Sequence, residues 1–123
     1  MLRLFPGIGQ AVVRSLLRTE GLHGLILETF GTGNGPTLDW FLGEIRSFIA
    51  RGGIVLNVTQ CQAGSVEMGL YETSAGLRSA GVISGRDITT EAAVTKMMIL
   101  LGSSMPKAKT ETLLSQSLSG EMS

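Results

Sequence analysis

The chain has 123 residues and a mass of 13.0 kDa, which is the size of one domain. Its residues are 43% hydrophobic and 16% charged, a composition that supports a buried core and excludes a disordered segment. Ten basic and ten acidic residues leave no net charge, and Lys and Arg form no cluster, so the composition argues against a nucleic-acid-binding protein.

Four short apolar stretches predict β-strands at residues 2–5, 24–29, 54–60 and 81–85. The longer ones are nearly continuous aliphatic runs, which is typical of strands covered on both faces in a parallel sheet. Helical patterns separate the strands and follow the last one. These patterns lie within residues 12–17, 36–53, 63–81, 86–102 and 107–123.

The helix predicted within residues 86–102 has the clearest start signal. Asp87 is expected to be its N-cap, and Glu91 lies in its first turns, where a negative charge is favourable. The spacing predicts a buried face made of Val94, Met97, Met98 and Leu101.

The order of the elements, β-α-β-α-β-α-β-α-α, predicts an α/β fold. Right-handed crossovers between the strands give a three-layer sandwich, with a four-stranded parallel sheet and helices on both faces. A single domain is expected over residues 1–123. No apolar run approaches the ~18 residues that span a membrane.

Ligands of such folds bind at the carboxyl ends of the strands, and the Gly-rich segment 28–36 follows the second predicted strand. Gly7 and Gly9 follow the first strand and suggest a dinucleotide-binding turn. That fingerprint requires Gly or Ala where Val12 stands, so the pattern does not favour a nucleotide site.

Catalytic and metal-binding patterns are also incomplete. Cys61 ends the third strand, whereas His23, the only histidine, precedes the second strand at the opposite end of the sheet, so no Cys–His pair is expected. No His, Cys or acidic cluster has the spacing of metal ligands, and we expect neither a metal nor another cofactor. A single cysteine suits a reducing cytosol.

Several stretches together resemble the C-terminal domain of type I (cytoplasmic) L-asparaginases. The stretches cover nearly the whole chain in order: "LRLFPGI", "LILETFGTGNGP", "IVLNVTQCQAGSVEMGLYETSAGL", "GVISGRDITTEAAVTKMMILLG" and "SLSGEMS". The resemblance implies one part of an amidohydrolase that converts L-asparagine to L-aspartate and ammonia without a cofactor.

In that family the catalytic Thr residues and the Asp–Lys pair lie in a larger N-terminal domain, so the resemblance predicts no catalytic residue in this chain and no activity of the chain alone. It also implies a cytoplasmic homo-oligomer that binds L-asparagine or L-aspartate and packs with the N-terminal domain. Nucleic acid and membrane are not expected as partners.

The resemblance further implies residues close to the substrate. Asn34 matches the Asn of the family's "GxGN" loop, where an amide can both donate to and accept from a zwitterionic amino acid, and Gly33 lets the backbone approach. Tyr71 lies in the region that the family extends toward a neighbouring subunit's substrate. A turn residue at Asn34 and an aromatic packed on the sheet at Tyr71 remain the structural alternatives.

Some type I enzymes carry an allosteric asparagine site, and Asn34, Gln60 and Cys61 match positions associated with it. In those members an Arg at the end of the second strand helps to hold the effector's carboxylate. Glu28 stands there instead and should repel a carboxylate. The sequence therefore argues against allosteric control by asparagine.

A function of another class stays open: a stand-alone amino-acid-binding or dimerisation module. Some animal relatives of the domain are lysophospholipases, but no GxSxG elbow occurs in the chain. A domain that packs against a larger partner should expose an apolar patch, so we expect the isolated chain to self-associate.

Overall fold

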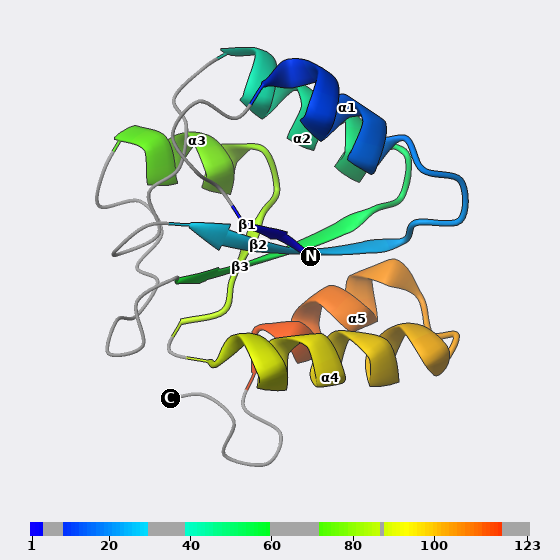
Figure 1. The fold of residues 1–123 in the computed structure, drawn as a ribbon. Coiled ribbons are helices and arrows are strands. Elements are labelled where there is room, and N and C mark those ends of the chain that lie inside the picture. The colour runs from blue at the N-terminus through cyan, green and yellow to red at the C-terminus, as the bar shows by residue number, and fades with distance from the viewer. Residues whose placement is uncertain (4–8, 30–38, 60–71, 87, 117–123) are drawn as a thin grey trace.

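The computed structural model describes residues 1–3, 9–29, 39–59, 72–86 and 88–116 (Figure 1). Its elements follow the predicted order. They are β1 (Leu2–Arg3), α1 (Gln10–Leu17), β2 (Gly24–Thr29), α2 (Asp39–Ala50), β3 (Ile54–Thr59), α3 (Glu72–Ser79), β4 (Ile83–Ser84), α4 (Thr90–Gly102) and α5 (Lys107–Leu114). No helix in these ranges is long and apolar enough to cross a membrane.

The sheet is parallel throughout, with the strand order β1-β2-β3-β4. Pairing is concentrated in the centre, where β2 and β3 run side by side from Gly24 opposite Ile54 to Thr29 opposite Thr59. The outer strands β1 and β4 have two described residues each. Strand β4 is shorter than predicted, whereas residues 4 and 5 of the first predicted strand lie outside the described residues. An α/β fold with a parallel sheet is confirmed, while most of the ladder belongs to two strands.

The helices form two layers, one on each face of the sheet (Figure 1). Helices α1, α2 and α3 cover one face, because each is a right-handed crossover between sequential neighbours of the sheet and such crossovers lie on the same side. Helices α4 and α5 follow the last strand and cover the opposite face.

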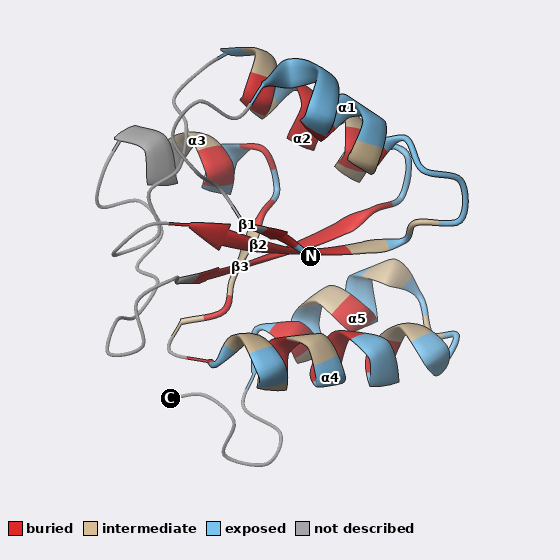
Figure 2. Ribbon diagram, viewed as in Figure 1, coloured by how far each residue is buried: buried red, intermediate tan, exposed pale blue. Residues whose placement is uncertain are grey.

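Both faces of the central strands are buried (Figure 2). Successive side chains of a strand point to opposite faces, so Leu25 and Leu27 join the core under α1–α3 while Ile26 joins the core under α4 and α5. Burial on both faces explains why β2 and β3 are nearly continuous apolar runs.

In helix α2 the apolar residues Phe41, Ile45, Phe48 and Ile49 recur at helical spacing, which predicts one buried stripe. Phe41, Ile45 and Phe48 are buried and Ile49 is half-buried. The turn after the helix needs glycine at position 53, because a Cβ there would lie 2.4 Å from the Phe48 ring.

The predicted buried face of α4 is wrong in part. The structure buries Ala93, Lys96, Met97 and Leu100, whereas Val94 and Leu101 are half-buried and Met98 is 68% exposed. The helix is apolar on nearly every side, so its periodicity does not identify the face that meets the sheet.

The predicted N-cap of α4 is also wrong. The helix begins at Thr90, and the N-cap is Thr89, whose hydroxyl oxygen accepts a hydrogen bond of 3.2 Å from the backbone N–H of Ala92. Asp87 lies outside the described residues and two positions before that cap. Glu91 is in the first turn, as predicted.

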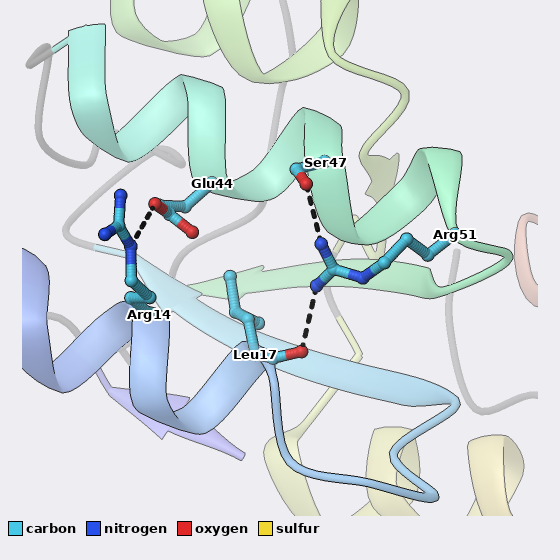
Figure 3. A network of polar contacts seen from close by, with 5 residues as sticks. All are labelled: Arg14, Leu17, Glu44, Ser47 and Arg51. Atoms are coloured by element: carbon cyan, nitrogen blue, oxygen red, sulfur yellow. Dashed lines mark hydrogen bonds and ion pairs between the residues drawn. The ribbon is translucent and has the colours of Figure 1, made fainter.

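Two arginines join α1 to α2 (Figure 3). Arg14 Nε donates to Glu44 Oε1 at 3.0 Å, and Arg51 Nη2 donates to the carbonyl of Leu17 at 3.2 Å. Glu44 is buried, whereas the Arg14 side chain is 48% exposed. Glu44 Oε2 is also buried and has no hydrogen-bond partner among the described residues.

We expect the two partners of this ion pair to respond unequally to substitution. At pH 7, Arg14→Met should lower the free energy of unfolding by about 1–2 kcal/mol, because it leaves a buried carboxylate without its donor. Glu44→Gln should cost only about 0.5 kcal/mol, because the half-exposed guanidinium can be hydrated again. Urea denaturation of both variants measures the difference.

The effect of Arg14→Met should depend on pH. The hydrogen bond and charge of Arg14 outweigh burial and hold the pKa of Glu44 below its ordinary value of 4.5. The pair therefore stabilises the fold above that value and loses its contribution as pH falls through the lowered pKa of the folded state. The gap in the free energy of unfolding between wild type and Arg14→Met should narrow as the pH falls below 4.5, the ordinary pKa of the carboxyl group. A gap independent of pH would contradict the role of this charge.

Candidate functional site

The candidate site lies at the carboxyl ends of the strands, the edge at which parallel α/β sheets bind ligands. The segments that follow β2 and β3 there lie outside the described residues. They contain five of the six predicted site residues: Gly33, Asn34, Gln60, Cys61 and Tyr71. Of the predicted set, the structure therefore describes Glu28 alone.

Glu28 is the next-to-last residue of β2 and is 1% exposed. It lies opposite Val58 of β3 and alternates with Leu27, which places it on the face that α4 and α5 cover. A carboxylate thus occupies a buried position directly before the predicted ligand loop.

Two further polar residues, which the sequence did not single out, lie at this edge on the face that α1–α3 cover. Thr29 Oγ1 donates to Asn57 Oδ1 at 2.8 Å, and both side chains are fully buried. This bond ties the end of β2 to β3, directly before the segments that carry the predicted ligand residues. An Asn inside the apolar run "IVLNVT" was the available sequence signal, since a buried amide needs a partner.

The end of β4 approaches the same point. The backbone N–H of Gly85 donates to the carbonyl of Asn57 at 2.8 Å, and a Cβ at Gly85 would lie 2.8 Å from that oxygen. Glycine is therefore required for this close approach. The next residue, Arg86, has a positive φ of 53°. Its Nη2 donates to the carbonyl of Ser115 at 2.8 Å, and this bond connects the edge to the end of α5.

The described part of the site offers a buried carboxylate, a buried amide and a buried hydroxyl, which lie just before the segments that carry the predicted ligand residues. His23 precedes β2 at the amino end of the sheet, as predicted, and its side chain is exposed. It lines a pocket of about 270 Å³ together with Arg18 and Arg51. Within the described ranges, no three His, Cys, Asp or Glu side chains could hold a metal ion.

The family model described as "Glutaminase/Asparaginase C-terminal domain" matches residues 1–114. L-asparaginase 1 of Escherichia coli (strain K12) is 42% identical over 119 residues, which are 97% of this chain and 35% of that protein. The 60 kDa lysophospholipase of Homo sapiens is 42% identical over 123 residues, 99% of this chain and 21% of that protein.

Solved structures agree with these matches. The crystal structure of L-asparaginase I from Vibrio cholerae superposes with a TM-score of 0.93 at 41% identity, over 99% of this chain and 36% of that one. The chain thus spans roughly a third or less of the length of the curated relatives described above.

Proposed function

Because the chain belongs to the family of glutaminase/asparaginase C-terminal domains, we propose that it is the C-terminal domain of a type I L-asparaginase. The enzyme is an amidohydrolase that hydrolyses L-asparagine to L-aspartate and ammonia in the cytoplasm. The observation that carries the proposal is the 42% identity to an L-asparaginase over 97% of this chain.

The chain supplies a subunit interface and residues near the substrate, and the catalytic residues come from a preceding N-terminal domain. The make-up of the described edge supports this division of roles. A catalytic nucleophile must reach its substrate, whereas the side chains of Glu28, Thr29 and Asn57 are buried. These residues therefore suit a role in holding the ends of the strands in place. The domain alone is inactive and needs no cofactor.

The ligand-facing residues of the proposal are Asn34 and Gly33 after β2 and Tyr71 after β3, with Gln60 and Cys61 near an effector position. Glu28 is the argument against an effector that carries a carboxylate. Its own carboxylate is buried at the end of β2, and two like charges repel more strongly where water is excluded. The enzyme therefore does not respond allosterically to asparagine.

A chimera tests the proposal. The part of E. coli L-asparaginase 1 that precedes the matched residues is joined to this chain, and ammonia release is measured from L-asparagine and, in parallel, from L-glutamine. We expect an active chimera and no release by the chain alone. Asn34→Ala should lower kcat/KM for L-asparagine by about 10–100-fold, the effect of losing one hydrogen bond to a charged substrate.

Val12→Ala is the matched control, because that side chain is 57% exposed on α1. It should leave kcat/KM unchanged. Hydrolysis by the chain alone would contradict the division of roles. A chimera that is folded by circular dichroism but inactive toward both amides would overturn the hydrolase proposal.

A further inference from the structure

The pocket of about 270 Å³ beside His23 lies at the amino ends of β2 and β3, the edge of the sheet opposite to the candidate site. Its walls are the turn that joins α1 to β2 and the turn that joins α2 to β3, which lie at the same edge (Figure 1). Each turn contains a glycine with a positive φ, 82° at Gly21 and 97° at Gly52, so that the chain reverses sharply into each strand.

The inner wall of the pocket is apolar. Leu17 and Phe48 line it and are each 2% exposed, and Leu22 is half-buried. All three belong to the core under α1–α3 or pack against it. The volume is just below the roughly 300–1,000 Å³ of pockets for drug-sized ligands, so the pocket suits a small molecule with an apolar part.

The remaining side chains favour an anion. Among the described residues that line the pocket, Arg18, His23 and Arg51 can carry a positive charge, and Glu20 carries the one negative charge. With a neutral imidazole, two guanidinium groups and one carboxylate leave a net charge of +1. A positively charged lining next to an apolar wall attracts small anions from solution.

Arg51 is already held in place for such a contact. Its Nη1 donates to Ser47 Oγ at 2.6 Å, and its Nη2 donates to the carbonyl of Leu17 at 3.2 Å (Figure 3). A guanidinium group has five N–H donors, so three of them can still donate to a ligand. Because the side chain is fixed before binding, little conformational entropy is lost when a ligand arrives.

The helix ends at this edge do not cancel the positive charge. The carbonyl ends of α1 and α2 carry partial negative charge, which disfavours an anion. Each end is paired with a cation: the carbonyl of Leu17 accepts from Arg51, and the carbonyl of Ile49 accepts from Lys107 Nζ at 2.9 Å. The Arg18 guanidinium therefore adds a positive charge beyond those that pair with the helix ends.

We propose that this pocket binds a small organic anion in which an oxyanion, a phosphate or a carboxylate, is joined to a small apolar group. The oxyanion accepts from Arg18 and Arg51, because the planar fork of a guanidinium matches the oxygens of both anions. The ring N–H of His23 is a further donor. The apolar group lies against Leu17 and Phe48. This inference does not rest on the proposed function.

Phenyl phosphate and benzoate are the probes, since each joins an oxyanion to one ring. The isotopically labelled 123-residue chain is titrated with each to about 20 mM at constant ionic strength, and the NMR shifts of its backbone amides are followed. The amides of residues 18–23 and 51–53 should shift, with a Kd on the order of 1 mM for the tighter probe, whose headgroup identifies the oxyanion. Phenol and inorganic phosphate each lack one half of the ligand and should bind at least about fivefold more weakly.

Arg18→Met should weaken binding of the tighter probe about tenfold, because it removes a charged donor. Arg18 is exposed, so this variant should fold as wild type does. Arg51→Met should weaken binding at least as much, although it also removes the bond to the carbonyl of Leu17. The matched control is Arg46→Met, an exposed position of α2 outside the pocket, and it should leave the Kd unchanged.

The proposal is overturned if neither probe shifts these amides, or if folded Arg18→Met binds as tightly as wild type. Equal weakening by Arg46→Met would do the same, because net charge and not the pocket would then hold the anion. Phenol that binds as tightly as phenyl phosphate would also overturn it. Amide shifts are read here and ammonia in the chimera assay, so either proposal can fail without the other.

Discussion

Phe41→Ala should lower the free energy of unfolding by about 3–5 kcal/mol, the cost of removing a large aromatic side chain from a packed core. Phe41 is fully buried between α2 and the sheet and belongs to the core under α1–α3. Its ring meets Trp40 edge to face, with centroids 5.9 Å apart, so the substitution also removes an aromatic contact. This loss is a large fraction of the about 5–15 kcal/mol by which native domains are stable.

Urea denaturation at pH 7 measures the loss. Phe41→Leu is the graded control and should cost about 1–2 kcal/mol, because it keeps most of the buried volume. Val12→Ala, on the exposed side of α1, should change stability by less than about 0.5 kcal/mol. A Phe41→Ala variant as stable as Val12→Ala would contradict the placement of this ring in the core.

Lys96→Met should lower the free energy of unfolding by about 1.5–3 kcal/mol, the range for hydrogen bonds that involve a charged group. Lys96 is 7% exposed, and its Nζ donates to the carbonyls of Leu114 and Gln116, at the C-terminal end of α5. The ammonium satisfies carbonyls that lack partners within the helix and lies at the negative end of its dipole. Methionine keeps the packing of the stem and removes only the donor.

Arg86→Met is the matched control, since Arg86 donates to the neighbouring carbonyl of Ser115 from an exposed position. It should cost less than about 1 kcal/mol, because water can replace an exposed donor. Hydrogen exchange in α5 should accelerate in Lys96→Met more than in Arg86→Met. A Lys96→Met variant at least as stable as wild type would contradict this, because the desolvation of the ammonium would then offset its two hydrogen bonds.

The position of the candidate site stays a prediction, and the structure describes one of its six predicted residues. Strand order and the rule for parallel sheets placed it at the carboxyl ends of the strands, and Glu28 lies there. The Thr29–Asn57 pair was missed, because the two residues are 28 positions apart and meet only through the register of β2 with β3. Asn34 and Tyr71 remain predictions.

The sequence by itself determined the order of the elements, the bounds of β2 and the buried stripe of α2, because each depends on periodicity within one segment. Tertiary structure alone decided which side of α4 meets the sheet, since its apolar residues lie on every side. It also decided the burial of Lys96, an ammonium that would remain in water if the carbonyls ending α5 were not within its reach.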